Sequence, residues 1–215
     1  MDFFDIHTHN NNKPVKNVFS IVNKYPTATN FANPFSIGIH PWFINKNKID
    51  EEFLIIEEKI QHKNCLAIGE CGLDKLTETD FELQQKVFRQ HILLSEKYKK
   101  PLLIHCVKSH QEVIAFKKEL QPTQPWVLHG FNKNVHIAES LLKNKLILSF
   151  GAVIINTIKL EEVVSKTPIS SIFLETDTAE VQIQSIYQKL AVIKNIEVIT
   201  LQKEIKNNFT KIFKR

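Results

Sequence analysis

The chain has 215 residues, of which 43% are hydrophobic and 24% charged, and its formal net charge is +5. These values fit one globular domain over residues 1–215, or at most two small ones. Apolar runs fall short of the ~18 residues of a membrane span, and the N-terminus lacks the pattern of a secretion signal. The three cysteines form no C-x-x-C pair, so a reducing cytoplasm is the expected location.

Short apolar runs alternate with longer amphipathic stretches along the chain. Seven runs predict strands: residues 2–9, 35–42, 65–74, 101–107, 125–131, 146–154 and 171–177. Six stretches predict helices: residues 50–62, 79–100, 110–120, 135–144, 185–195 and 203–215. Strand followed by helix, repeated, is typical of parallel βαβ units.

Three polar residues stand where helices are expected to begin, namely Asp50, Ser109 and Asn134, and each is a candidate N-cap. Residues 196–200 could form an eighth strand, but they are more simply the lead-in to the last helix. His62, His91 and His136 lie in helix-like stretches and are expected at the surface.

Reactive side chains stand at the ends of nearly all the apolar runs: His7, His9, His40, Glu70, His105, His129 and Asp177. In a closed parallel barrel the C-terminal ends of all strands meet at one rim, where barrel enzymes have their active sites. In an open sheet these side chains could not all meet. The sequence therefore predicts an α/β fold of the TIM-like (β/α) barrel type with seven clear strands.

Six of these residues form a candidate metal-binding set: His7, His9, Glu70, His105, His129 and Asp177. Mixed imidazole and carboxylate donors suit Zn, Mn, Co, Fe or Ni better than Mg. Six ligands exceed the need of one catalytic ion and indicate two divalent ions, which activate water and polarise a phosphoryl or carbonyl oxygen. Asp5 shares the alternate-residue face of the first strand with His7 and His9.

Each residue alone also has a structural explanation. His105 could be a hydrogen-bonded core histidine, and Asp177 or Thr176 could cap a helix. The metal hypothesis rests on their joint placement at successive strand ends.

Six motifs occur together and in order: DIHTH, GIHPW, GECGLD, PLLIHC, HGF and LETD. In this order and context they resemble the TatD family of metal-dependent hydrolases, from Met1 to about Asp177. The resemblance implies a TIM-like barrel, two divalent ions and, for several members, deoxyribonuclease activity.

Carried over by position, the resemblance implies that His7, His9, Glu70 and Asp177 serve one metal. Glu70 would bridge to a second metal held by His105 and His129. Asp177 and Glu70 would be the catalytic residues, with Asp177 orienting the attacking water or taking its proton. His40 would line the pocket or support a ligand.

The chain also departs from the family pattern. Val107 stands where an arginine is usual, leaving Lys108 and His110 as nearby substitutes. Ala179 replaces a proline, and the loops after GECGLD and after Asp177 are shortened. These departures weaken the expectation of deoxyribonuclease specificity more than that of hydrolysis.

The predicted function is hydrolysis of a nucleic acid or a small phosphoester, with no membrane or obligate protein partner. Trp42 could stack on a base or pack in the core. One alternative is a carbon–nitrogen or carboxylic-ester hydrolase of the amidohydrolase type, favoured by Val107 and the short loops. A non-catalytic binding protein is a third interpretation.

Overall fold

The chain is built from two compact units, seen in a computed structural model that describes residues 2–10 and 15–213. The terminal unit comprises Met1–Val22 and His129–Arg215, and the central unit comprises Asn23–Leu128. The expectation of a single domain over residues 1–215 stays a prediction. None of the described helices is long and apolar enough to cross a membrane.

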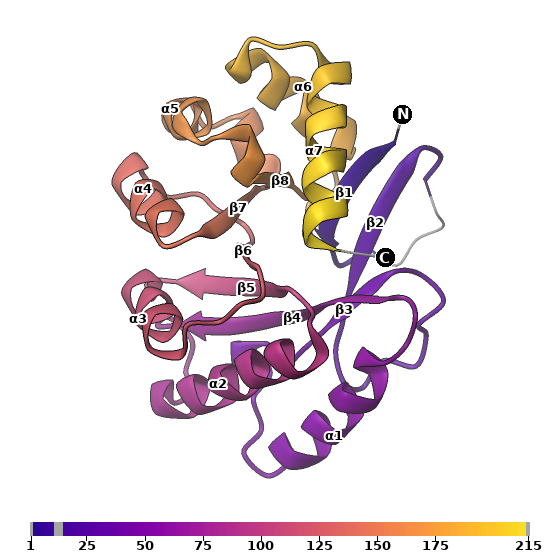
Figure 1. The fold of residues 1–215 in the computed structure, drawn as a ribbon, viewed down its shortest axis with the longest axis vertical. Coiled ribbons are helices and arrows are strands. Elements are labelled where there is room, and N and C mark those ends of the chain that lie inside the picture. Colours follow the sequence, from indigo (N-terminus) through magenta and orange to yellow (C-terminus); the bar gives the residue numbers. More distant parts are fainter. Residues whose placement is uncertain (1, 11–14, 214–215) are drawn as a thin grey trace. The chain divides into compact units, whose positions relative to one another are not determined.

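In the central unit, neighbouring strands pair in parallel. These strands are β3 (Phe35–Ile37), β4 (Cys65–Asp74), β5 (Leu102–Val107) and β6 (Trp126–Leu128). The helices α1 (Ile49–Ile60), α2 (Phe81–Tyr98) and α3 (His110–Leu120) follow strands in turn, with the short 3₁₀ helix η1 (Pro41–Phe43) after β3 (Figure 1). Helices α1 and α2 pack on β4. Every residue of β4 is buried, as expected for a parallel strand covered on both faces.

Strands β4 and β5 approach each other closely at two glycines of β4, Gly69 and Gly72. Gly72 pairs with His105 and has a φ of +143°, and a Cβ atom there would lie only 2.0 Å from the His105 carbonyl oxygen. Only glycine fits such a backbone and such a contact. The sequence of β4 thus fixes where β5 presents His105.

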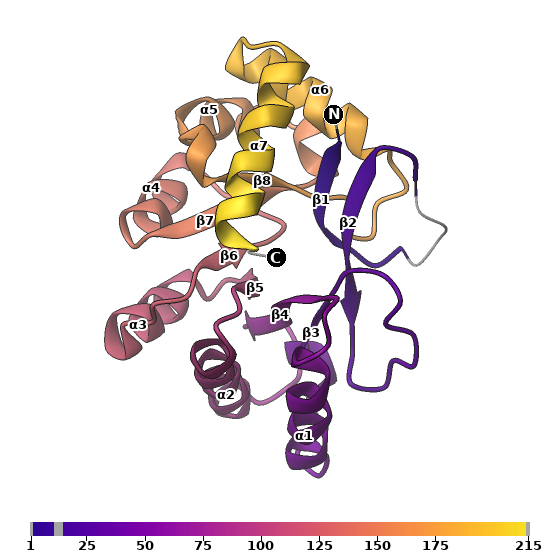
Figure 2. The ribbon, with the colours of Figure 1, turned by 45° about the vertical axis from the view of Figure 1, so that its right-hand side comes forward.

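The terminal unit contains two parallel strand pairs. The strands are β1 (Phe3–Thr8), β2 (Val18–Lys24, whose last two residues belong to the central unit), β7 (Leu146–Phe150) and β8 (Ile172–Leu174). The helices are α4 (Val135–Lys143), α5 (Lys159–Lys166), α6 (Ile183–Lys194) and α7 (Val198–Ile212), with 3₁₀ turns η2 (Ala152–Ile155) and η3 (Ile169–Ser171). Helices α6 and α7 lie beside β1 and β8 (Figure 2).

Aromatic side chains hold α7 against β1. The Phe209 ring lies 4.6 Å from Phe4 and 5.0 Å from Phe19, and Phe213 stacks on Phe209 at 4.9 Å, measured between ring centroids. The predicted C-terminal helix therefore exists and docks through its apolar face, while its last two predicted residues lie outside the described part of the chain.

Each of the seven runs predicted as strands contains one. Residues 196–200 form no strand: Ile196 and Glu197 lead into α7, and residues 198–200 are its first turn, so the helix begins earlier than predicted. Two elements were missed, β2 and α5. The described residues between β1 and β3 contain no helix, so β2 breaks the alternation on which the prediction relied. Helix α5 has only two turns, although Leu160, Val163 and Val164 show its buried helical spacing.

Two local predictions were wrong, those for Asp50 and His91, and the prediction for Ser109 holds only for its position. Lys48, not Asp50, is the N-cap of α1, and Asp50 lies in the first turn, where its charge favours the helix dipole. Ser109 is the N-cap residue of α3 as predicted, but its hydroxyl donates to the Leu73 carbonyl and makes no capping hydrogen bond. His91 is fully buried in α2. By contrast, Asn134 caps α4 as predicted, accepting from Ile137 N at 3.1 Å.

Candidate metal centres

Backbone hydrogen bonds bring two histidines of the first motif to Asp177. The Asp177 amide donates to the His7 carbonyl at 2.9 Å, and the His9 amide donates to the Asp177 carbonyl at 3.0 Å. Asp177 has a φ of +52°, a left-handed conformation that aspartate tolerates better than most residues. The turn after β8 thus places the Asp177 carboxylate beside both imidazoles.

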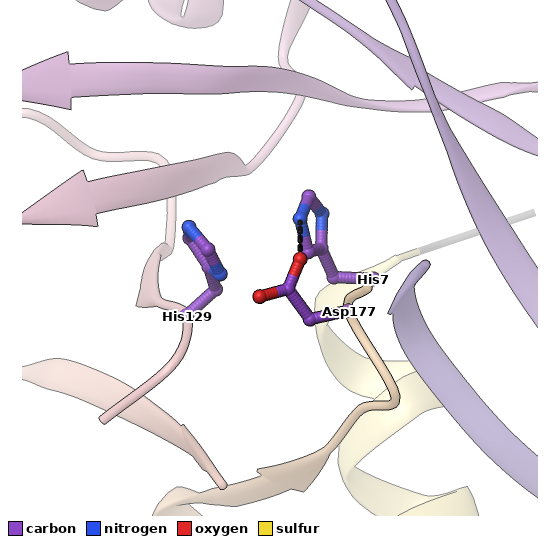
Figure 3. A group of neighbouring side chains, drawn as sticks. All are labelled: His7, His129 and Asp177. Atoms are coloured by element: carbon purple, nitrogen blue, oxygen red, sulfur yellow. Dashed lines mark ion pairs between the residues drawn. The ribbon is translucent and has the colours of Figure 1, made fainter. Parts of the chain in front are cut away.

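Three histidine side chains of the terminal unit lie close to the Asp177 carboxylate. Asp177 Oδ1 lies 3.6 Å from His7 Nε2 and 3.5 Å from His9 Nε2. The rings of His7 and His129 lie 4.4 Å apart between centroids, and donor atoms of His7, His129 and Asp177 all lie within 4.8 Å of one another. Figure 3 shows the Asp177 carboxylate between the two imidazole rings. We call His7, His9, His129 and Asp177 the terminal cluster.

Asp5 anchors the turn that carries Asp177. Its carboxylate accepts from the Thr176 amide at 3.0 Å and from the Thr176 hydroxyl at 2.7 Å, and that hydroxyl also contacts Thr8 Oγ1 at 2.9 Å. Burial raises the pKa of Asp5 to about 7, although the Thr176 hydrogen bonds oppose the shift. Asp5 therefore ties β1 to the turn that follows β8.

Glu175 holds the ring of His129. Glu175 Oε1 accepts from the Gly130 amide at 2.6 Å and lies 3.3 Å from His129 Nδ1. The Glu175 side chain is fully buried. Sequence analysis did not single out Glu175, although it belongs to the LETD motif.

In the central unit, two histidines flank Glu70. Glu70 Oε1 lies 3.1 Å from His40 Nε2 and 3.2 Å from His105 Nδ1. His40 Nδ1 accepts from the Trp42 amide at 3.2 Å, and the Glu70 amide donates to Asn23 Oδ1 at 2.9 Å. Donor atoms of His40, Glu70 and His105 all lie within 4.8 Å of one another. We call these three residues the central cluster.

Asp74, at the end of β4, contacts the ring nitrogen of His105 that does not face Glu70. Asp74 Oδ2 lies 3.1 Å from His105 Nε2 and accepts from the indole N–H of Trp42 at 2.6 Å, while Oδ1 accepts from the Leu76 amide at 2.8 Å. Burial opposes ionisation of Asp74, but the hydrogen bonds from Trp42, Leu76 and His105 outweigh it and lower the pKa. Asp74 was also not singled out from the sequence.

The other predicted residues of the central unit differ in their exposure. Lys108 is exposed and has a φ of +51°, and His110 is the first residue of α3. Trp42 and Phe43 are 54% and 57% exposed, unusual for large aromatic side chains. The donor atoms of His129 lie within 4.8 Å of those of His7 and Asp177. The grouping of His129 with His105 and Glu70 that the resemblance implies stays a prediction.

Both clusters fit a divalent cation by their chemistry and spacing. Each combines imidazole nitrogens with a carboxylate, the donors of Zn, Mn, Co, Fe and Ni sites. Two ligands bound to one such ion at about 2.1 Å lie about 3.0–3.6 Å apart. The nitrogen–oxygen separations of 3.2 to 3.6 Å at Asp177 and between His105 and Glu70 agree with that spacing.

Comparison with known proteins identifies the family. The family model described as TatD related DNase matches residues 4–214. An uncharacterized metal-dependent hydrolase of Buchnera aphidicola is 39% identical over 149 residues, which cover 66% of this chain and 55% of that protein. A putative deoxyribonuclease TATDN1 homolog of Vairimorpha ceranae is 26% identical over 79% of this chain and 61% of that protein. The chain thus spans little more than half the length of these relatives.

The crystal structure of YjjV, a TatD homolog from Escherichia coli, matches with a TM-score of 0.83 and 20% identity, covering 99% of this chain and 98% of that one. The fold is therefore a TIM-like α/β barrel, as predicted. The chain belongs to the TatD related DNase family. Relatives of this family are named metal-dependent hydrolases.

Proposed function

We propose that this chain is a metal-dependent hydrolase that cleaves phosphodiester bonds of nucleic acid with the help of two divalent cations. The observation that carries the proposal is that each unit holds its own cluster of imidazole and carboxylate donors at metal-binding spacing. Bound cations polarise a phosphoryl oxygen and lower the pKa of a bound water.

The residues of the chain have distinct tasks in this proposal. His7, His9, His129 and Asp177 hold one cation, and Glu70 and His105 hold the other. The Asp177 side chain is 37% exposed while His7 is buried, so Asp177 is the carboxylate that can orient the attacking water and accept its proton. The bridging role that the resemblance implies for Glu70 stays a prediction; bridging requires that Glu70→Gln weaken binding of both cations.

Exposed aromatic and basic residues favour a single-stranded nucleic acid as the substrate. The Trp42 indole is held by its hydrogen bond to Asp74, yet half of the side chain is exposed beside the equally exposed Phe43. Exposed Lys46 and Lys48 follow in the chain. Aromatic rings that stack on unpaired bases, with lysines for the phosphates, are the usual means of binding single strands. The deoxyribonuclease names in the family agree with this choice.

Val107 favours a second candidate, the hydrolysis of a carboxylic ester or amide. An arginine at the end of β5 would grip a phosphate with two parallel hydrogen bonds, which valine cannot form. The same cations could polarise a carbonyl oxygen instead of a phosphoryl oxygen.

The test is a substrate panel with the metal-stripped full chain and added Mn, Mg, Zn or Co. We expect cleavage of single-stranded DNA or RNA, and a loss of at least about 100-fold in kcat for Asp177→Asn. Asp50→Asn, on the exposed start of α1, removes the same charge and should leave kcat unchanged. Turnover of lactones or amides alone would favour the second candidate. Failure of every substrate with every metal would refute both.

A further inference from the structure

Two buried carboxylates outside the predicted ligand set each contact one ring nitrogen of a candidate metal ligand. Asp74 Oδ2 lies 3.1 Å from His105 Nε2 in the central unit. Glu175 Oε1 lies 3.3 Å from His129 Nδ1 in the terminal unit. The contacted nitrogen differs between the two rings.

We propose that Asp74 and Glu175 are positioning residues that hold His105 and His129 in opposite tautomers. His105 carries its proton on Nε2 and offers Nδ1 to a cation, whereas His129 carries its proton on Nδ1 and offers Nε2. The inference rests on the metal binding of the proposed function, but the tautomers themselves exist without metal.

The partners of Asp74 fix it as an acceptor. Oδ2 already accepts from the indole nitrogen of Trp42, and Oδ1 accepts from the Leu76 amide; both of these groups can only donate. The His105 nitrogen that faces Oδ2 must therefore supply a proton. The other nitrogen, Nδ1, then faces Glu70 Oε1 at 3.2 Å with its lone pair. A lone pair beside a carboxylate oxygen is unfavourable unless a cation or proton lies between them.

The partners of Glu175 likewise fix it as a hydrogen-bond acceptor in the terminal unit. Oε1 accepts from the Gly130 amide at 2.6 Å, so His129 Nδ1 donates to this oxygen. Gly130 follows His129 in the chain, so one carboxylate oxygen fixes both the backbone and the ring. The other nitrogen, Nε2, is then the one that carries the lone pair, and the donor atoms of His7, His129 and Asp177 lie within 4.8 Å of one another.

The carboxylate–histidine arrangement has a known physical effect. A hydrogen bond to one ring nitrogen fixes the ring orientation and raises the basicity of the other nitrogen, and loss of the partner typically costs 10–100-fold in metal affinity. In each unit a carboxylate thus fixes one ring nitrogen of a histidine and makes the other more basic, with Nε2 fixed in His105 and Nδ1 in His129.

The decisive measurement uses the wild-type, metal-free chain with ¹⁵N-labelled histidine rings. Two-bond ¹⁵N–¹H spectra distinguish the tautomers, and spectra of His105→Gln and His129→Gln assign the two rings. The spectra are recorded at a pH high enough that both rings are neutral, and we then expect the proton on Nε2 of His105 and on Nδ1 of His129. The same tautomer in both rings, or each proton on the opposite nitrogen, would overturn the inference even if the chain binds metal and hydrolyses its substrate.

Variants of Glu175 separate positioning from packing. Glu175→Gln keeps an acceptor oxygen for His129 and Gly130, so Co²⁺ affinity should stay within a few-fold of wild type. Glu175→Leu keeps the size but removes the acceptor, so affinity at one of the two cation sites should fall about 10–100-fold. Glu162→Gln, an exposed residue of α5, is the charge-matched control.

The corresponding variant in the central unit is Asp74→Leu, with exposed Glu58→Gln on α1 as its control. Asp74→Leu should lower Co²⁺ affinity at the other cation site by a similar factor. Unchanged Co²⁺ affinity in folded Glu175→Leu and Asp74→Leu, with folding verified by circular dichroism, would contradict a positioning role. A chain that binds no metal refutes the proposed function, while the tautomer spectra still decide this inference.

Discussion

Histidine has different roles in this chain, and the atoms around each ring decide which one it takes. His7 and His9 face the carboxylate of Asp177, as ligands of one cation would. His105 contacts the Asp74 carboxylate through its Nε2 atom. His91 is a core residue whose Nε2 accepts from the Ile39 amide at 3.0 Å. The residue type alone does not separate these roles, because the partners come from distant parts of the chain.

The buried His91 predicts a pH dependence of stability. Burial lowers its pKa to about 4, although a hydrogen bond to the Val87 carbonyl opposes the shift. In the unfolded chain the ring titrates near 6.5, so between about pH 6.5 and pH 4 the unfolded state binds more protons. The stabilisation is complete above about pH 6.5 and is lost as the pH falls towards 4, by about 3 kcal/mol.

Urea unfolding of the metal-free chain between pH 4 and pH 7.5 measures this effect. Wild type should lose stability across this range more steeply than His91→Gln, whose amide oxygen can still accept from the Ile39 amide. Identical pH slopes for the two proteins would show that His91 does not titrate as a buried group.

Phe43 tests the proposed binding of unpaired bases. Its ring is 57% exposed and packs edge-on against Tyr25 at 5.4 Å. Base–aromatic stacking is worth about 1–3 kcal/mol, so Phe43→Ala should raise KM for single-stranded DNA about 5–100-fold with kcat nearly unchanged. Leu54→Ala, which removes an exposed apolar side chain from α1, is the control. An unchanged KM would remove the stacking role.

At the scale of elements, β4 organises the central cluster. It carries Glu70 and ends at Asp74, and its glycine lets β5 bring His105 close. The strand could be predicted from its apolar run, and Glu70 from its motif. The support of Asp74 for His105 could not, because it depends on the register between two strands, which one sequence does not reveal.

Gly72→Ala should therefore destabilise the chain strongly. A methyl group would meet the His105 carbonyl oxygen in a backbone conformation that alanine disfavours, which should cost about 3 kcal/mol or more. Gly151→Ala is the matched control, because the nearest atoms would lie 3.7 Å from its Cβ and its φ is negative. Equal unfolding free energies for the two variants would contradict the close approach of β4 and β5.

The elements that were missed have a common physical reason. The prediction expected each strand to be followed by a helix, and β2 has none before β3 among the described residues. Helix α5 is short, so its buried face consists of Leu160, Val163 and Val164 only. Long periodic segments such as α2 were predicted well, because many residues contribute to their pattern.

At the scale of the whole molecule, the two units share one principle. Each brings imidazoles and a carboxylate to metal-binding spacing, and each supports one of its histidines with a buried carboxylate. The donors were predictable from motifs at strand ends. The supporting carboxylates were not, because their contacts join residues far apart in the chain.

The metal stoichiometry of the metal-stripped and reloaded chain tests the central claim most directly. Elemental analysis after equilibration with Zn²⁺ or Mn²⁺ should give two ions per wild-type chain and one ion for either His7→Gln or His105→Gln, since each variant loses a donor of one cluster. The double variant should bind none. The same number of ions in wild type and in all three variants would contradict the account.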